Sequence, residues 1–246
     1  MKKKKSNFYK ARSTETQYAR ALRAVAREVG RIIDAFQGDL TLATSGMLAE
    51  ALRKYSTILT PWARAKAALM LAQVDGQDQR AWRKATKEMS LEIRETVKNT
   101  PVGERLQELM NENVKLITSL PTQAAERVHK LVLENFEEQN RSSEIAEEIK
   151  RSGKVASSRA TLIARTEVAR ASSLLTQSRA EFVGGEGYIW RTVRDSDVRL
   201  DHKKLEGKFI RFDSPPKHDD GMTYHAGQGP NCRCFMEPII PEELFS

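Results

Sequence analysis

The feature that most constrains the fold of this chain is the stretch from residue 13 to residue 185, which is rich in helix-forming residues. Alanine, leucine, arginine, glutamate, lysine and glutamine dominate it, and all six have high helix propensity. Apolar side chains recur at helical spacing, as in Leu22, Val25, Val29 and Ile32, a pattern typical of a helix with one buried face. No strict heptad continues over several repeats, so the pattern favours a multi-helix arm or bundle over a coiled coil.

Proline and glycine predict where these helices begin and end. Gly38-Asp39 is expected to end the first helix. Thr60-Pro61 is expected to begin another, since threonine caps helices and proline is favoured in the first turn. Asp75-Gly76 and Ser152-Gly153 are expected to end helices, and Leu120-Pro121 to separate two of them. The helices predicted after the first span residues 40–57, 62–74, 78–99, 101–119, 121–139, 142–151 and 156–184.

The residue types change after Gly187. Residues 188–193 are aromatic and β-branched, residues 208–212 alternate, and residues 234–238 form a third short run, so we predict two or three short strands. Residues 195–205 are expected to form a short polar helix or turn. Residues 214–230 form a loop of a length typical of functional or disordered segments. The predicted fold class is mainly α: a helical N-terminal arm or bundle, then a compact, loop-rich α+β C-terminal domain.

The charge of the chain is unevenly distributed. There are 41 lysine and arginine residues against 33 acidic residues, a formal net charge of +8. Residues 181–246 hold 9 basic and 12 acidic residues, so the other 32 basic and 21 acidic residues give residues 1–180 a net charge of +11. Such a region favours double-stranded DNA, bound without sequence specificity. The alternative is that these charges only keep the helices soluble. The expected DNA contacts are Lys2, Lys3, Lys4, Lys5 and Lys10.

Several classes of protein are disfavoured by what the sequence lacks. No apolar run approaches the ~20 residues of a membrane-spanning helix, and no apolar segment follows the N-terminal lysines, as a secretory signal requires. We therefore expect no membrane partner and assembly in a cytoplasm. Neither Gly-x-x-x-x-Gly-Lys-Ser/Thr nor Gly-x-Gly-x-x-Gly occurs, which argues against an ATP-driven motor.

Polar residues of the C-terminal region are the candidates for a site. Asp195, Arg199 and His202 are spaced i, i+4 and i+7, which would place them along one face of a helix. Asn231-Cys232-Arg233-Cys234 follows further along the chain. We expect a polar network in which Asp195 pairs with Arg199 or Arg233, while the Asn231 side chain holds a turn.

The two cysteines of the chain, Cys232 and Cys234, leave more than one interpretation open. A disulfide between residues so close in sequence is rare, so two reduced thiols are the simplest interpretation. A zinc site would use His202, Cys232 and Cys234, with His218 or His225 as a fourth ligand.

A cysteine hydrolase is a further alternative. It would use Cys232 with His202 or His225 as the base and with Asn231 or Asp195 to orient the base. No local signature of such an enzyme surrounds the cysteine.

Several segments, taken in order, resemble one known family. Ala164-Arg165-Thr166-Glu167 precedes Trp190-Arg191-Thr192, and Asn231-Cys232-Arg233-Cys234 closes the series near Pro238. Between them lie Asp195, Arg199, His202 and Leu205-Glu206-Gly207. Over about residues 155–240 this order resembles the Mu F-like domain of phage minor head, or head morphogenesis, proteins. The signature residues that the resemblance implies are Arg165, Glu167, Trp190, Asp195, Arg199, His202, Gly207, Asn231, Cys232, Arg233 and Cys234.

The resemblance implies a structural role and no catalysis. It implies a minor capsid protein inside the virion head, associated with the portal protein, packaged DNA and the major capsid or scaffold protein. Such a protein acts in procapsid assembly, DNA packaging or DNA delivery, and assembles in the cytoplasm of the bacterial host. The expected organisation is a disordered basic tail over residues 1–12, a helical arm or bundle over 13–154, the Mu F-like domain over 155–240 and a tail over 241–246.

The chain also departs from the family pattern. Members can carry Cys-x-x-Cys where this chain has Arg199 and His202, and a histidine often precedes Asn-Cys-Arg-Cys, where this chain has Gly229-Pro230. Because fewer metal ligands remain, no cofactor is expected, and zinc is the alternative. The alternative functions are a zinc- or cysteine-dependent hydrolase and a non-specific DNA-compacting protein.

Overall fold

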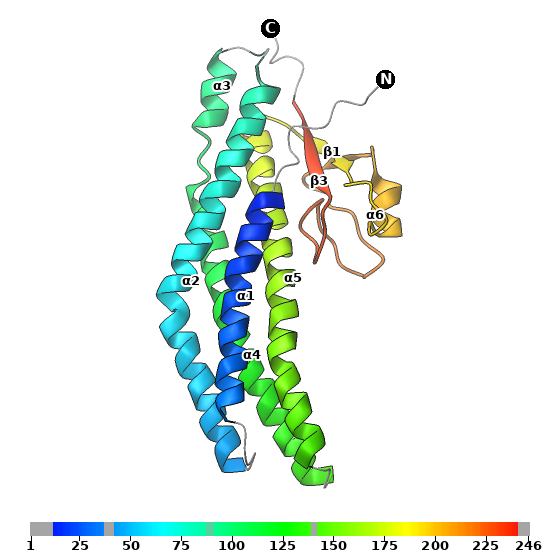
Figure 1. Cartoon of the computed structure of the whole chain (residues 1–246). Helices are drawn as coiled ribbons and strands as arrows, with labels where there is room; N and C mark the ends of the chain where they lie inside the picture. Colours follow the sequence, from blue (N-terminus) through cyan, green and yellow to red (C-terminus); the bar gives the residue numbers. More distant parts are fainter. Residues whose placement is uncertain (1–11, 37–41, 88, 90, 139–141, 241–246) are drawn as a thin grey trace. The chain divides into compact units, whose positions relative to one another are not determined.

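The computed structural model describes residues 12–36, 42–87, 89, 91–138 and 142–240. The lysines expected to contact DNA and the tail over residues 241–246 lie outside the described residues. Helices and a small antiparallel sheet make up the regular structure of these ranges, as the predicted fold class requires (Figure 1). The chain divides into two compact units. None of the described helices is long and apolar enough to cross a membrane.

One unit, Thr16–Ala68 with Met110–Ala164, is a bundle of helix segments. It contains most of α1 (Arg12–Ala35) and parts of α2 (Leu42–Ala85), α4 (Gly103–Glu138) and α5 (Ser142–Phe182). Tyr18 donates to Asn113 Oδ1 at 2.8 Å and joins α1 to α4 inside this bundle. The fully buried side chains that form its core include Leu22, Leu48, Leu52, Ile117 and Leu120.

The bundle helices continue through residues that predict breaks. α4 passes through Pro121 and α2 through Pro61, so the predicted starts at these prolines are wrong. Proline deprives a helix of one hydrogen bond. Near Pro121, however, burial of Leu120 favours the continuous helix, and the Ser56 hydroxyl donates to the Thr118 carbonyl at 2.8 Å, which joins α2 to α4 beside the proline.

The predicted breaks at Gly76 and Gly153 are also wrong. A Cβ at position 153 would lie 3.2 Å from Gly30 Cα, so Gly153 allows α5 to approach α1 closely instead of ending a helix. Conversely, the helix predicted over residues 78–99 is interrupted, because α2 ends at Ala85 and α3 spans Leu91–Lys98. Met89 lies between them and is buried in the core of the second unit.

The second unit combines Met1–Glu15, Leu69–Leu109 and Arg165–Ser246. Its sheet has the order β2-β1-β3, with β1 (Gly187–Arg191) antiparallel to both β2 (Phe209–Arg211) and β3 (Phe235–Ile239). The three strands therefore lie where the sequence predicts them, with bounds shifted by one or two residues. Tyr188 and Trp190 of β1 are fully buried. They pack in one cluster with Trp82, Val97, Phe212, Met236 and both cysteines.

Residues 195–205 contain a helix that is shorter than the spacing suggests. α6 spans only Leu200–Leu205, with Arg199 at its N-cap position. Asp195 and Arg199 therefore precede the helix, and the expectation that they share one helix face with His202 is wrong. Of these three residues, His202 alone lies within α6, and its side chain is buried.

A buried ion cluster within the second unit joins α2 to α5. The Arg179 guanidinium pairs with Asp75 at 2.5 Å and also with Asp78, and Thr176 donates to Asp78 at 2.5 Å. Burial raises the pKa of Asp78 to about 6, although Arg179 and Thr176 act in the opposite direction. Because Asp75 and Asp78 both face Arg179, α2 remains helical across Gly76.

Candidate functional site

The Arg165-Thr166-Glu167 segment of α5 holds the turn that precedes the cysteines. Arg165 donates to Asn231 Oδ1 at 2.9 Å, and the Asn231 backbone N–H donates to Thr166 Oγ1 at 3.0 Å. Asn231 has a φ of 58°, in the left-handed region that asparagine tolerates better than most residues. Glu167 is buried and pairs with Arg170 at 3.4 Å. The Asn231 side chain, which we expect to hold a turn, thus has its hydrogen-bond partner, Arg165, on α5.

Arg233 connects the cysteine segment to the loop before α6. Its guanidinium lies 2.6 Å from a carboxylate oxygen of Asp195 and 3.2 Å from one of Asp197. Of the two partners expected for Asp195, the structure therefore places Arg233 beside it. Arg199 instead donates to the Pro230 carbonyl at 2.8 Å and to the Tyr224 hydroxyl at 3.3 Å.

Gly207 and Trp190, two further signature residues, connect α6 to the sheet. Gly207 has a φ of +82°, a conformation that a side chain disfavours, and its N–H donates to the Trp190 carbonyl at 2.8 Å. The neighbouring Glu206 accepts from Thr192 N at 2.6 Å and from Arg194 at 2.7 Å. Burial alone would raise the pKa of Glu206, but these hydrogen bonds outweigh it and lower the pKa.

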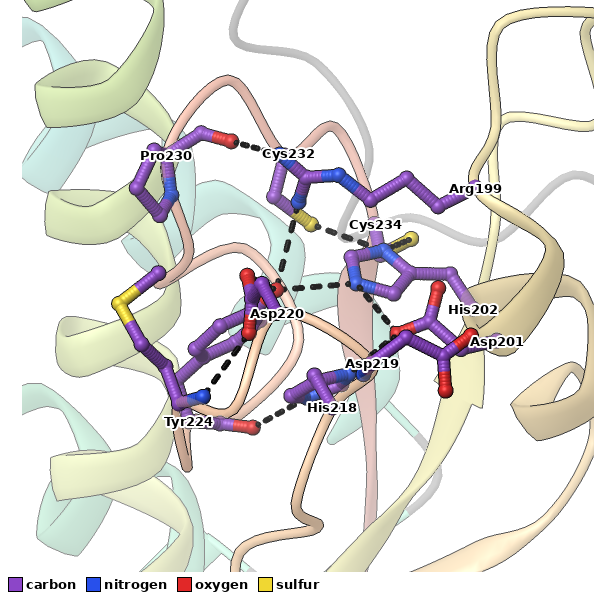
Figure 2. Close-up of polar contacts among 11 residues, drawn as sticks. Arg199, Asp201, His202, His218, Asp219, Asp220, Tyr224, Pro230, Cys232 and Cys234 are labelled. Carbon is purple, nitrogen blue, oxygen red and sulfur yellow. Dashed lines mark hydrogen bonds and ion pairs between the residues drawn. The ribbon is translucent and has the colours of Figure 1, made fainter.

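His202, Cys232 and Cys234 form a buried cluster (Figure 2). Both sulfurs point to the same ring nitrogen: His202 Nδ1 lies 3.6 Å from Cys232 Sγ and 3.5 Å from Cys234 Sγ. A hydrogen bond from the Cys234 thiol, assisted by His202, lowers the pKa of Cys232. The same sulfur pair raises the pKa of Cys234, because a second thiolate would be buried beside the first. Together the three residues offer three atoms that zinc prefers.

The other ring nitrogen of His202 faces a tyrosine. His202 Nε2 lies 3.3 Å from the Tyr224 hydroxyl, which donates to Asp220 Oδ2 at 3.0 Å. Burial and the Asp220 carboxylate raise the pKa of Tyr224 above its usual value, so the hydroxyl keeps its proton. Since that proton points to Asp220, the Tyr224 oxygen is left to accept from His202 Nε2–H.

The remaining two histidines of this unit are engaged elsewhere. His218 Nδ1 lies 3.0 Å from Asp201 Oδ2, and its Nε2 lies 3.0 Å from the Tyr224 carbonyl. His225 Nε2 lies 3.0 Å from the Phe212 carbonyl, and burial lowers the pKa of His225. Both rings use their nitrogens to hold loop residues. Asp201, His202 and His218 form a second group of possible metal ligands beside the first.

A small cavity of about 60 Å³ opens beside the cysteines. Two guanidinium groups and the three possible zinc ligands contribute to its wall. The lining residues are Asp197, Val198, Arg199, His202, Asn231, Cys232, Arg233 and Cys234. Its volume is enough for one or two water molecules or a small ligand.

The geometry does not assemble the three groups of a cysteine hydrolase. His202 Nδ1 faces Cys232, and His202 Nε2 lies 3.3 Å from the Tyr224 hydroxyl. The carboxylate beside that nitrogen, Asp201, is 3.8 Å away, which is too long for a hydrogen bond, and it contacts His218 at 3.0 Å instead. Asn231 and Asp195, the expected third members, face Arg165 and Arg233.

The sequence patterns single out neither Tyr224 nor Asp220, and they contain Thr166 only as part of the segment from Ala164 to Glu167. A signal for Tyr224 was present, because this aromatic residue lies in the polar loop directly before His225 and near Gly229. A Cβ at position 229 would lie 2.4 Å from the Tyr224 ring, so the glycine makes room for the tyrosine.

Comparisons with known proteins point to the segment that contains this site. Residues 126–237 match the family model described as Phage Mu protein F like protein. A protein of Haemophilus influenzae, described as uncharacterized, is 31% identical over 145 residues, which are 58% of this chain and 32% of that protein. The chain thus spans about a third of the length of the curated relative it matches. No solved structure matches the chain.

Proposed function

We propose that this chain is a minor head protein of the Mu F-like family, to which residues 126–237 are similar, and that it contacts the portal and packaged DNA inside the head. The observation that carries the proposal is the match of residues 126–237 to the family. The geometry of the signature residues is consistent with it, since Arg165, Asn231, Arg233 and Gly207 all form contacts that hold loops in place. Procapsid assembly, DNA packaging and DNA delivery are the steps in which the protein would act.

A basic groove in the bundle unit supports the DNA contact. It has a volume of about 850 Å³ and lies between residues 120–130 of α4 and residues 151–162 of α5. No aspartate or glutamate is among the described residues that line it. The cationic residues of this groove are Arg127, Lys130, Arg151, Lys154 and Arg159.

The charge pattern around the groove favours a phosphate backbone. Glu148 pairs with Arg127 at 3.2 Å and also with Arg151, and Glu134 pairs with Lys130 at 3.4 Å, so two carboxylates face three of the five cations. DNA that lies along this surface would replace small counterions, which makes the affinity strongly dependent on salt.

The first experiment measures duplex binding at several salt concentrations. A triple variant, Lys130→Gln, Arg151→Gln and Lys154→Gln, removes three charges of the groove. The control triple, Arg31→Gln, Arg53→Gln and Lys98→Gln, removes three exposed charges elsewhere. We expect the groove variant to bind more weakly and to reduce the log–log salt slope by up to ~0.9 for each DNA phosphate that it no longer neutralises. Equal effects of the two triples would refute the groove assignment.

The second experiment tests the portal contact. The chain is co-expressed with the portal protein encoded in the same phage genome, and the portal ring is purified through its own tag. Co-purification of this chain at high salt would support the proposal, because DNA bridging is then suppressed. DNA binding without any portal association would instead favour the general DNA-compacting protein.

A further inference from the structure

Two sulfur atoms and one ring nitrogen surround a single point in the second unit. Cys232 Sγ and Cys234 Sγ lie 3.6 Å and 3.5 Å from the same His202 Nδ1 (Figure 2). Zinc binds thiolate sulfur at about 2.3 Å and imidazole nitrogen at about 2.0–2.1 Å. At a tetrahedral angle these bond lengths separate sulfur from nitrogen by about 3.6 Å. The spacing around Nδ1 therefore equals that of a zinc site.

Hydrogen bonds alone account for this arrangement of His202, Cys232 and Cys234 less well than a bound metal ion does. A neutral imidazole has one nitrogen that carries hydrogen and one with a single lone pair. The contact of His202 Nε2 with Tyr224, whose own proton points to Asp220, assigns the hydrogen to Nε2. Nδ1 then has one lone pair for two sulfurs at nearly equal distance. A metal ion between the three atoms uses that lone pair and both sulfurs at once.

The surroundings of the cluster resemble those of a metal site. A histidine ligand usually donates its second N–H to a fixed acceptor, as His202 does to Tyr224. The buried Trp190 Nε1 has no hydrogen-bond partner of normal geometry among the described residues. A cysteine thiolate would supply this indole with an acceptor.

The chain supplies the two sulfurs from one short segment. Cys232 and Cys234 are two residues apart just before β3, and both are buried, whereas Arg233 between them turns to Asp195 and Asp197. His202 comes from α6. An ion held by these three residues would fasten α6 to the entry of β3.

We propose that His202, Cys232 and Cys234 bind one zinc ion, whose fourth coordination position faces the 60 Å³ cavity. His218 and His225 are not ligands, because their ring nitrogens contact Asp201, Tyr224, Phe212 and Tyr188. A water molecule or a small anion between Arg199 and Arg233 fills the fourth position. Two thiolates and neutral imidazole balance the charge of Zn²⁺, so the site needs no further protein carboxylate.

The test begins with the metal content of the full chain, purified without a metal-affinity tag and dialysed against metal-free buffer with added Zn²⁺. About one bound zinc per chain is expected, and Co²⁺ in its place should give a thiolate-to-cobalt charge-transfer band. Cys232→Ser and Cys234→Ser should each weaken that band by at least half, and the double variant should abolish it. His129→Gln, which changes a histidine of the bundle unit far along the chain from the cluster, is the matched control and should leave it unchanged.

A second variant keeps the result interpretable if a cysteine variant fails to fold. Tyr224→Phe retains the ring that stacks on His218 at 3.9 Å but removes the acceptor of His202 Nε2–H. The Tyr224→Phe variant should therefore bind Zn²⁺ about 10–100-fold more weakly than the unmodified chain, because this is the usual effect of removing a hydrogen-bond partner that orients a metal ligand.

Three outcomes would overturn the proposal. The first is a correctly folded chain that binds neither Zn²⁺ nor Co²⁺. The second is a bound metal without the charge-transfer band. The third is metal binding that survives both cysteine variants but is abolished in His218→Gln, which would assign the metal to Asp201, His202 and His218.

Discussion

Replacement of Arg179 tests the physical account of the second unit most severely. Its guanidinium has 1% side-chain exposure and faces Asp75 and Asp78, whose side chains are 19% and 2% exposed. Arg179→Met keeps the apolar stem but leaves Asp78 as a buried carboxylate with no cation. Removing one partner of a buried ion pair typically costs about 3–5 kcal/mol.

The assay is urea unfolding followed by tryptophan fluorescence, because Trp82 and Trp190 are both buried in this unit. A destabilisation of about 3–5 kcal/mol corresponds to a decrease in Tm of roughly 6–20 °C for a chain of this size. The control is Lys98→Met, which breaks an exposed pair with Glu95 and should cost less than about 1 kcal/mol. The double variant Asp78→Leu/Arg179→Met should recover most of the stability, since it removes the unpaired buried charge. The reasoning is refuted if Arg179→Met costs no more than Lys98→Met, or if the double variant is no better than the single one.

Further predictions concern pH and backbone strain. Since the folded pKa of Asp78 is about 6 against a usual value of 3.8, the folded state binds this proton more tightly. The free energy of unfolding should therefore fall by ~3 kcal/mol as pH rises from about 4 to 6. Urea unfolding at a series of pH values measures this, and the Asp78→Asn variant should not show this decrease. Gly207→Ala should cost about 1–2 kcal/mol from its positive φ alone, because the nearest atom would lie 3.9 Å from the new Cβ. Gly46→Ala in α2, where nothing lies within 4 Å, should stabilise the chain by up to about 1 kcal/mol. The strain argument would be contradicted if the Gly207→Ala variant were at least as stable as the Gly46→Ala variant.

Sequence patterns predicted the local structure well where local forces dominate. The strands begin and end close to the predicted residues, because aromatic and β-branched residues at 188–193 have few other conformations that bury them. The helices were predicted as shorter pieces than the structure contains. Pro61, Pro121, Gly76 and Gly153 each weaken a helix locally, but packing in the bundle and the ion cluster at Arg179 outweigh these local costs.

The candidate site was predicted in its parts but not in its connections. The pairing of Asp195 with Arg233 follows from their opposite charges, and the turn at Asn231 follows from its residue type. Tyr224 and Asp220 could not be placed beside His202 from the sequence, because the loop over residues 214–230 brings them there through a path with no regular spacing. The helical spacing of Asp195, Arg199 and His202 was misleading, since α6 begins only at Leu200.

The central claim is that this chain is a component of a phage head. Quantitative mass spectrometry of purified procapsids and DNA-filled heads, from the phage that encodes it, tests this claim most directly. The account predicts that the chain is present in both particles at a small fraction of the major capsid protein. Its absence from both, with the portal protein detected in the same samples, would contradict the account.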